Sequence, residues 1–401
     1  MNIDGFHTTA GFAKRALEQL TQREIDNQCE FGLDTYYQRY SKSFVSRLPG
    51  MSRAIVDKAM TEMENDGYVF GKKLSGKTEL YDLTIEQIVD IYAHRKIPKF
   101  RDNISEVIVM YLSNLKGGVS KTVSAATLAH GLRTHPMLIQ HDIRVLLIDI
   151  DPQASSTMFM KHDLAIADMT TTSVQSMLQN PSREELLSEF IYETKVPGVY
   201  ILPCTIADGF IASDWHNLCE QHLPDQNPYM ILRENIIEKI KHDFDFCLLD
   251  TGPHLDPLLM NSIVAADVLA TPLPPAQVDL HSTLQYTSRL PAILTNLEQR
   301  GVSRLPRHHL AFMTKMSKSS QDQDALAVAK AVFREELVDT TLPNLSAFQR
   351  CGETFDTVLT ANPDYYNGDK RALSSAKKAV EDFTFSVFHH VSSYLKVNHN
   401  A

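Results

Sequence analysis

The sequence has no long apolar run and few cysteines. None of its apolar stretches approaches the roughly 18 residues that a membrane-spanning helix needs, and the N-terminus is too polar to suggest a secretory signal. The five cysteines are scattered and odd in number, and no two of them have C-x-x-C spacing. This usage favours a reducing cytoplasm and argues against a zinc ribbon or an iron–sulfur ligand pair. We therefore expect a cytoplasmic protein with no membrane partner.

Basic residues do not dominate the chain either. Its formal net charge of −10 does not by itself suggest a nucleic-acid partner. The charge is unevenly distributed, however, because residues 41–105 carry eleven Lys or Arg against nine Asp or Glu. A DNA-binding face can exist in an acidic protein, since contact depends on local basic groups. At 401 residues the chain is also long enough for two or three domains.

A strand, a glycine-containing turn and a helix follow one another from residue 107 to residue 133. Residues 107–112 are apolar and too few for a helix, which predicts a buried strand. The turn after it reads Lys116-Gly117-Gly118-Val119-Ser120-Lys121-Thr122. This order places backbone N–H groups around an anion at the N-terminus of the helix. Lys121 would reach the β- and γ-phosphates of a nucleotide and Thr122 would hold Mg²⁺; a lysine-bearing turn without a ligand is the alternative.

The turn departs from the usual phosphate-binding pattern G-x-x-x-x-G-K-[ST]. Leu115 and Ser120 stand where that pattern has its two glycines, and Lys116 adds a second lysine. The arrangement resembles the deviant phosphate loop of the ParA/MinD ATPases. In that family the first lysine contacts nucleotide phosphates across a dimer interface, so the resemblance implies this role for Lys116. Ser120 has less backbone freedom than glycine would have at the same place.

Two further buried strands are expected to end in carboxylates. Residues 144–151 end in Asp149 and Asp151, and residues 244–250 end in Asp250. The carboxyl ends of parallel strands meet at one edge of a sheet, where ligands bind. The similarity to ParA ATPases implies that Asp151 orients the attacking water and that Asp149 lies near the Mg²⁺ shell. It also implies that Asp250 holds Mg²⁺ through water; for Asp149 and Asp151 the alternative is a pair of turn-forming residues.

The rest of the predicted sheet follows Asp250. Residues 251–253 predict a switch segment, because glycine and proline there can absorb a change of dihedral angle. Residues 268–275 and 310–315 predict a fourth and a fifth strand. In the ParA family the segments after these late strands wall the adenine and ribose, which implies this role for Thr314 and Pro274. Strands that alternate with helices predict an α/β fold, a doubly wound and mostly parallel sheet over residues 104–401.

An N-terminal helix precedes this domain within residues 1–35. Residues 12–31 alternate apolar and charged positions at helical spacing, but the apolar stripe is narrow. A lone helix of this kind needs a surface to pack against. A second copy of the chain would make the helix a dimerisation element, and docking on its own domain is the alternative.

Residues 36–103 predict a winged helix-turn-helix domain. Residues 36–48 predict a first helix, and Ser52 caps a second helix that ends near Gly67. Strands at 68–70 and 80–83 flank a basic hairpin tip at 71–77, and a capping box at Thr84 starts another helix. The second helix would enter the major groove, and the hairpin would reach an adjacent groove or phosphates. The candidate DNA contacts are Arg53, Lys58, Lys72, Lys73 and Lys77. A protein-interaction module with solvated lysines is the alternative.

Basic residues return near the C-terminus. Residues 97–103 predict a linker, and residues 343–395 predict helices. The pattern leaves these basic residues of the second stretch exposed: Arg350, Lys370, Arg371, Lys377 and Lys378. Plasmid-partition ATPases bind nonspecific DNA through basic residues in this part of the chain, so the resemblance favours Arg350 as a contact; a solvated arginine is the alternative. The tail from His389 has no basic amphipathic helix, which argues against a membrane-cycling role.

With a winged helix in front, the chain resembles the long plasmid-partition ParA proteins. The resemblance implies a homodimer with ATP or ADP and Mg²⁺ as cofactors, and a weak ATPase that a ParB-type centromere-binding partner stimulates. It also implies operator binding that represses the protein's own operon, and nonspecific binding to nucleoid DNA with ATP. One alternative is a transcriptional repressor that senses nucleotide without a hydrolysis cycle. Another is a reductase of the nitrogenase iron-protein type, which the cysteine spacing disfavours.

Overall fold

The computed structural model describes residues 3–32, 34–166 and 169–398, and a seven-stranded sheet forms the centre of this described part. The strand order is β5-β6-β4-β7-β3-β8-β9. Neighbouring strands are parallel except for β5, which pairs antiparallel with β6. The strands are β3 (Ile108–Leu112), β4 (Val145–Asp149), β5 (Tyr192–Glu193), β6 (Val199–Leu202), β7 (Phe246–Asp250), β8 (Val268–Leu273) and β9 (His308–Met313). The predicted doubly wound, mostly parallel sheet is confirmed, whereas β5 and β6 were not predicted.

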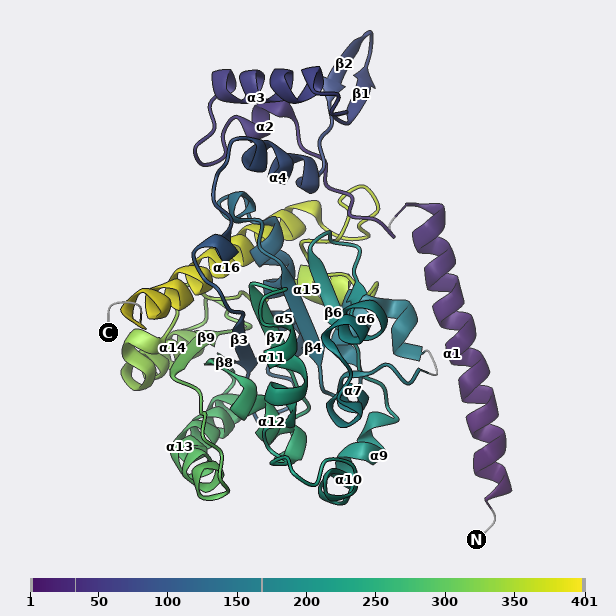
Figure 1. The fold of residues 1–401 in the computed structure, drawn as a ribbon, viewed down its shortest axis with the longest axis vertical. Coiled ribbons are helices and arrows are strands. Elements are labelled where there is room, and N and C mark those ends of the chain that lie inside the picture. Colours follow the sequence, from purple (N-terminus) through teal and green to yellow (C-terminus); the bar gives the residue numbers. More distant parts are fainter. Residues whose placement is uncertain (1–2, 33, 167–168, 399–401) are drawn as a thin grey trace.

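Helices cover both faces of the sheet (Figure 1). One face packs against α5 (Lys121–Thr134) and α16 (Lys370–Asn398), and the other against α12 (Pro257–Ala265) and α13 (Gln277–Gln299). The other helices of this domain are α6 (Ser155–Met160), α7 (Ser173–Gln179), α8 (Arg183–Glu185), α9 (Asp208–Ser213), α10 (Trp215–His222), α11 (Glu238–Ile240), α14 (Ser320–Phe333) and α15 (Ser346–Gly352). Short 3-10 or π segments are η1 (Phe100–Asp102), η2 (Ile139–His141), η3 (His162–Ile166), η4 (Leu186–Phe190), η5 (Arg233–Ile237) and η6 (Arg334–Glu336).

The side chains of β3 divide the core into two layers. Met110 and Leu112 belong to the layer under α5 and α16, whereas Val109 and Tyr111 belong to the layer under α12 and α13. This is the alternation that a strand buried on both faces requires. The strand therefore reads as one continuous apolar run in the sequence.

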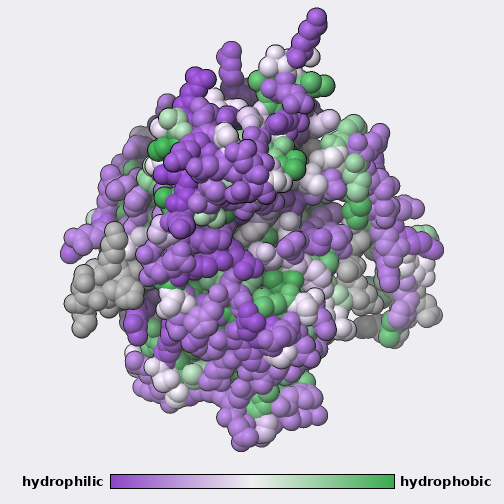
Figure 2. Space-filling model, turned by 45° about the horizontal axis from the view of Figure 1, so that its top comes forward, coloured by the Kyte–Doolittle hydropathy of each residue, from purple (hydrophilic) through white to green (hydrophobic). Residues whose placement is uncertain are grey.

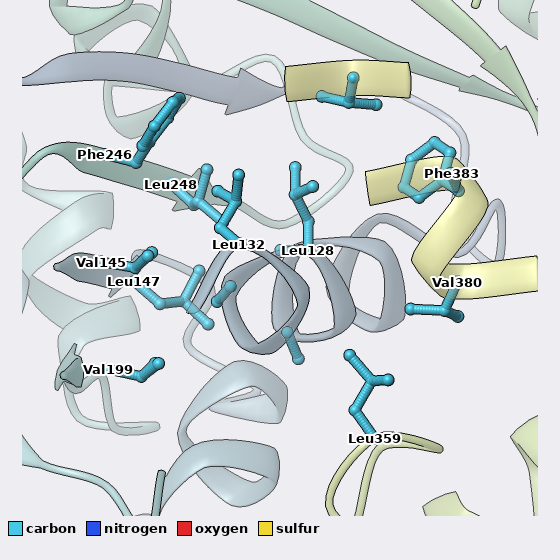
Figure 3. Packing of buried hydrophobic residues seen from close by; sticks show 14 of the residues in the cluster. Leu128, Leu132, Val145, Leu147, Val199, Phe246, Leu248, Leu359, Val380 and Phe383 are labelled. Atoms are coloured by element: carbon cyan, nitrogen blue, oxygen red, sulfur yellow. The ribbon is translucent and has the colours of Figure 1, made fainter. Parts of the chain in front are cut away.

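The helices α5 and α16 pack against each other on one face of the sheet, and α16 also contacts the strands through Phe383, whose ring centroid lies 4.9 Å from that of Phe312 on β9. Figure 3 shows Leu128 and Leu132 of α5 on the side of the strands, and Phe383 on the neighbouring α16. The two helices approach closely at Gly131, where an added Cβ would lie 2.2 Å from Oγ1 of Thr384. A larger residue at this position would push α16 away, so the glycine fixes the distance between the two helices.

A small N-terminal domain has a core of its own. It consists of α2 (Lys42–Val45), α3 (Arg53–Asn65), the hairpin of β1 (Lys72–Ser75) and β2 (Thr78–Tyr81), and α4 (Ile85–His94). The predicted caps are confirmed, since Oγ of Ser52 accepts a hydrogen bond from the Ile55 amide and Thr84 forms a capping box with Gln87. Ile139 of η2 packs into the same core, which attaches this domain to the sheet domain at the end of α5.

Two expectations for this domain are wrong in detail. Of the predicted helix over 36–48, only α2 is helical, because Tyr40 is extended and exchanges backbone hydrogen bonds of 2.8 and 2.9 Å with Leu83. The first strand of the hairpin is also misplaced in the prediction, because residues 68–70 are not in a strand and β1 begins at Lys72; Lys72 and Lys73 therefore lie on β1, and only Lys77 lies in the turn. At Tyr40, pairing with a segment distant in sequence satisfies backbone groups that the local pattern assigns to a helix.

The helix α1 (Asp4–Glu30) stands beside the sheet domain (Figure 1). It begins earlier than the predicted helix over 12–31, and most of its side chains are exposed, including Phe12 at 61% and Leu20 at 65%. Thr21 is buried, and α1 contacts η3. The helix therefore keeps much uncovered apolar surface along its length.

The segment predicted as a linker, 97–103, is packed rather than free. Phe100 of η1 is buried against Phe246 of β7 and Phe388 of α16, with ring centroids 5.3 and 5.7 Å apart. Arg101 forms an ion pair of 3.2 Å with the buried Asp245. These contacts fix the start of the sheet domain against the C-terminal helix.

The predicted helical stretch over 343–395 is divided. Residues 353–369 between α15 and α16 are not helical. Lys377 was predicted to be exposed, but its ammonium contacts the hydroxyl of Tyr37 and donates to the carbonyl of Ala361 at 3.4 Å, and burial lowers its pKa. Lys378 is exposed as predicted. None of the helices among the described residues is long and apolar enough to cross a membrane.

Candidate functional site

The turn between β3 and α5 forms a loop around the ammonium group of Lys121. Lys121 is the first residue of α5 and is only 7% exposed, and its Nζ donates to the carbonyl of Lys116 at 3.3 Å. Burial lowers the pKa of Lys121, while the charges of Asp250 and Asp151 act in the opposite direction. The loop therefore presents one buried cation and the free N–H groups of a helix N-terminus, which together suit an anion.

The backbone of this loop is fixed from several sides. Oδ1 of Asn114 accepts from the Lys116 amide at 2.9 Å, and its Nδ2 donates to the Pro272 carbonyl at 3.0 Å. Lys315 donates to the Gly118 carbonyl at 2.6 Å. Ser120 has a φ of +74°, in the left-handed region that favours glycine. The structure thus explains why the usual pattern has glycine at this position, and why serine there is strained.

Asp149 and Asp250 lie side by side at the ends of β4 and β7, where the two strands pair them in register. Both are fully buried. Burial and the charge of Asp250 raise the pKa of Asp149. Burial raises the pKa of Asp250 to about 6, whereas the hydroxyls of Thr122 and Ser156 and the charge of Lys121 lower it. The expected convergence of the loop and the strand ends at one edge is therefore present.

The two carboxylates differ in their partners. Oδ2 of Asp149 accepts from the amide and the hydroxyl of Thr157, both at 2.8 Å, and its Oδ1 accepts from the Asp151 amide at 3.1 Å. Oδ2 of Asp250 accepts from Ser156 at 2.8 Å, but its buried Oδ1 has no hydrogen-bond partner among the described residues. Of these two carboxylates, Asp250 is therefore the one with an oxygen that no described residue engages in a hydrogen bond.

Asp151 lies at the mouth of the same edge. Its Oδ1 accepts from the Gln153 amide at 3.0 Å, and an added Cβ on Gly252 would lie 3.3 Å from the same oxygen. The predicted switch segment therefore passes directly beside Asp151. The same segment also approaches the phosphate loop, because an added Cβ on Gly117 would lie 3.8 Å from Cγ of Pro253.

Lys116 lies apart from these groups. Its Nζ is 3.7 Å from Oδ1 of Asp279 on α13, and the side chain is 37% exposed. The structure therefore does not bring Lys116 together with Lys121, Asp151 and Asp250 within one copy of the chain.

A cavity of about 480 Å³ opens beside the loop. Thr314 lines it, but Pro274 does not, although Pro274 is buried nearby in the chain after β8. The hydroxyls of Ser124 and Thr127 on α5 also line it, and both are buried without a hydrogen-bond partner among the described residues. Residues 342–346 form the opposite wall. Sequence reasoning missed this wall, because residues 342–344 reach the cavity by pairing with Met316.

The candidate DNA contacts of the N-terminal domain gather on α3 and the hairpin. Arg53, Lys58 and Lys77 are exposed. Several of these lysines form ion pairs with carboxylates. The distance from Nζ to the carboxylate oxygen is 3.8 Å for Lys58 and Glu62, 3.7 Å for Lys72 and Glu64, and 2.6 Å for Lys73 and Asp82. Figure 2, in which this domain comes forward, shows a mostly hydrophilic surface with hydrophobic side chains in small separate groups.

Arg350 lies far along the chain from that domain, on α15. It is 53% exposed and forms an ion pair of 3.4 Å with Glu353. Together with Glu24 of α1 it lines a small cavity of about 160 Å³. The helix α1 thus passes close to this arginine.

Comparisons with known proteins cover both domains. A family model described as the ParA helix-turn-helix domain matches residues 13–104, and a model described as an AAA domain matches residues 105–300. The chain is 48% identical over 382 residues to the plasmid partition protein A of Escherichia coli, an alignment that covers 95% of this chain and 96% of that protein.

Solved structures give the same relationship. A structure of a partition protein has a TM-score of 0.78 and 41% identity to this chain, and the match covers 98% of each. A structure of cobyrinic acid a,c-diamide synthase from Mycobacterium smegmatis with bound ADP and magnesium has a TM-score of 0.52 at 20% identity. That match covers 72% of this chain and 96% of the synthase, and it shows a shared fold.

Proposed function

This chain belongs to the ParA family of plasmid-partition proteins, and from that premise we propose that it hydrolyses ATP to ADP and phosphate during plasmid segregation. The observation that carries the proposal is the buried ammonium of Lys121 in its loop, next to the carboxylates of Asp250 and Asp151. A cation at a helix N-terminus binds the phosphates, and a carboxylate beside it can orient water for attack on the γ-phosphate. We assign the first role to Lys121 and residues 117–122, and the second to Asp151.

The residues at the site fit a magnesium ion that is shared with a nucleotide. The unpartnered Oδ1 of Asp250 and the hydroxyl of Thr122 would hold the ion, whose charge would neutralise the phosphate oxygens. Among the described residues, no cluster of three His, Cys, Asp or Glu side chains could hold a metal without a nucleotide. The bound ADP and magnesium of the synthase with the same fold support this assignment. The cavity beside Ser124, Thr127 and Thr314 would take the base and ribose.

The active form in this proposal is a homodimer. The position of Lys116, whose ammonium pairs with Asp279 on α13 rather than with Asp151 or Asp250, supports its assignment to the nucleotide of a second copy. The uncovered apolar side chains of α1 support a contribution of that helix to the dimer.

The proposed cycle also involves DNA and a second protein. The N-terminal domain would bind the operator through Arg53, Lys58, Lys72, Lys73 and Lys77 and so repress the protein's own operon. Arg350 would contribute to nonspecific DNA binding by the ATP form on the nucleoid, in the bacterial cytoplasm. A ParB-type centromere-binding protein would stimulate hydrolysis.

The variant Asp151→Ala distinguishes a hydrolysis cycle from nucleotide sensing alone. We expect this variant to bind ATP as the wild type does and to release phosphate at least about 100-fold more slowly, because the attacking water loses the carboxylate that orients it. Phosphate release and nucleotide binding are measured on the same preparations. If wild type and variant release phosphate equally slowly while ATP still alters operator binding, the chain is a nucleotide-sensing repressor without a hydrolysis cycle.

A further inference from the structure

The first turn of α6 contacts both buried carboxylates of the site. Ser156 donates its hydroxyl hydrogen to Oδ2 of Asp250 at 2.8 Å. Thr157 donates both its amide and its hydroxyl hydrogen to Oδ2 of Asp149 at 2.8 Å. All four side chains are fully buried. Two adjacent residues of one short helix therefore hold the ends of two neighbouring strands.

The placement of α6 is itself fixed at two points. Oγ1 of Thr157 accepts a hydrogen bond from the Cys204 amide at 3.1 Å, which ties the helix to the segment after β6. Ala154, just before α6, has a φ of +53°, and its amide donates to the Asp151 carbonyl at 2.8 Å. A non-glycine residue in the left-handed region costs energy, so the surrounding contacts hold the turn in this shape.

These contacts leave the two aspartates with different hydrogen-bonding patterns. Thr157 and the Asp151 amide engage both oxygens of Asp149. Ser156 engages one oxygen of Asp250 and leaves the other unpartnered within the described part of the chain. Since a carboxylate that is held at one oxygen cannot rotate freely, the second oxygen keeps a fixed direction.

We propose that Ser156 and Thr157 are positioning residues, which hold Asp149 as a support for α6 and aim the free oxygen of Asp250 at the metal. The proposal rests on the proposed nucleotide function. It gives Ser156 no contact with substrate, and it assigns Asp149 to support rather than to the metal shell. Loss of the Ser156 hydroxyl then weakens metal binding and leaves the phosphate loop intact.

The test compares Ser156→Ala and Ser156→Thr with the wild type and with Ser262→Ala. Ser262 is a matched control, because it is also a fully buried helical serine, but its hydroxyl donates to the Leu258 carbonyl on α12. Binding of a fluorescent, non-hydrolysable ATP analogue is titrated with Mg²⁺ and is also measured with EDTA. Near-ultraviolet circular dichroism checks that each variant is folded.

Removal of a group that orients a metal ligand typically costs about 10- to 100-fold in metal affinity. We therefore expect Ser156→Ala to raise the Mg²⁺ concentration at half-saturation by about that factor, with analogue binding in EDTA unchanged. Ser156→Thr keeps the hydroxyl and should show the wild-type Mg²⁺ concentration at half-saturation. The control Ser262→Ala should also leave this concentration unchanged.

Two outcomes contradict the proposal in different ways. If wild type and Ser156→Ala share one Mg²⁺ half-saturation, Ser156 does not position the metal ligand, while the nucleotide function stands. If the wild type binds no analogue at any Mg²⁺ concentration, the nucleotide function is wrong and the positioning role falls with it. A Ser156→Ala variant that loses analogue binding equally with EDTA and with Mg²⁺ shows general damage to the site and also overturns the proposal.

Discussion

Lys121 donates a hydrogen bond from its ammonium group to the backbone carbonyl of Lys116, 3.3 Å away. The two lysines of the loop thus have different positions, since one side chain is buried inside the loop and the other lies against α13. A phosphate group that enters the loop would offer Lys121 a charged acceptor in place of a neutral one, and charge-assisted hydrogen bonds are the stronger kind.

The two lysines should therefore respond differently to substitution. We expect Lys121→Ala to lower the affinity for ATP about 100-fold, because a buried charged hydrogen-bond donor is lost. We expect Lys116→Ala to keep the affinity of the single chain within about threefold and to lower turnover, since in the proposed dimer Lys116 contacts the nucleotide of the second copy. Equilibrium binding at low protein concentration and phosphate release at high concentration measure the two effects. Equal loss of affinity in both variants would contradict the assignment.

Ser120→Gly should stabilise the protein. The left-handed conformation costs a non-glycine residue about 1 to 2 kcal/mol, and the larger freedom of glycine in the unfolded chain offsets part of this, so we expect a gain of about 0.5 to 1 kcal/mol. Denaturant unfolding without nucleotide measures the free energy. Ser124→Gly is the control, because Ser124 lies inside α5 and glycine there should destabilise by a similar amount. A loss of stability in Ser120→Gly would mean that the serine hydroxyl has an unrecognised role.

The lysines of the hairpin should differ in their effect on operator binding. Lys77 lies in the turn with no ion-pair partner in the described ranges, whereas Lys73 pairs with Asp82 at 2.6 Å. Each phosphate contact contributes about 0.9 to the slope of log affinity against log salt concentration. We expect Lys77→Ala to reduce the slope by about 0.9 and Lys73→Ala to reduce it less. Arg350→Ala should leave operator binding unchanged, and an unchanged slope in Lys77→Ala would exclude the hairpin from the DNA interface.

Acid should destabilise the fold through a buried histidine on the α5 side of the core. Burial lowers the pKa of His135 to about 4, below the usual value of 6.5. The unfolded chain binds a proton below about pH 6.5 and the folded protein only below about pH 4, so stability falls as the pH decreases between these values. At pH 5 the loss from this group is about 1 to 2 kcal/mol.

The variant that removes this titration is His135→Asn, which retains an acceptor for the Met137 amide. Its unfolding free energy should depend less steeply on pH between 6.5 and 4 than that of the wild type. His222→Asn, at an exposed position, should leave the slope unchanged. A wild-type slope in His135→Asn would show that other groups cause the acid loss.

The edge of the sheet could be predicted because its signals are local. Each signal lies within a few consecutive residues: the apolar run of a strand, the turn with two lysines, and the carboxylates that follow further apolar runs. Parallel topology then brings these segments together. The capping residues Ser52 and Thr84 were recognised for the same reason.

The features that were missed depend on pairing between distant segments. Tyr40 lies in a stretch whose pattern predicts a helix but pairs with Leu83, and residues 342–344 carry no signal that they will pair with Met316. Ser156 and Thr157 come shortly after the predicted strand over 144–151, yet their contact with the carboxylates depends on the turn at Ala154. Lys377 has the periodicity of an exposed position, and only the fold places Tyr37 beside it.

The attachment of the N-terminal domain at Ile139, close to the end of α5, has a consequence for assemblies on DNA. One helix connects the phosphate loop to the core of the domain that we propose binds DNA, so in that proposal each bound copy would hold its sheet at a set rotation about the DNA axis. Moving one of two adjacent binding sites by half a helical turn, about 5 base pairs, would point the two phosphate loops to opposite sides of the duplex.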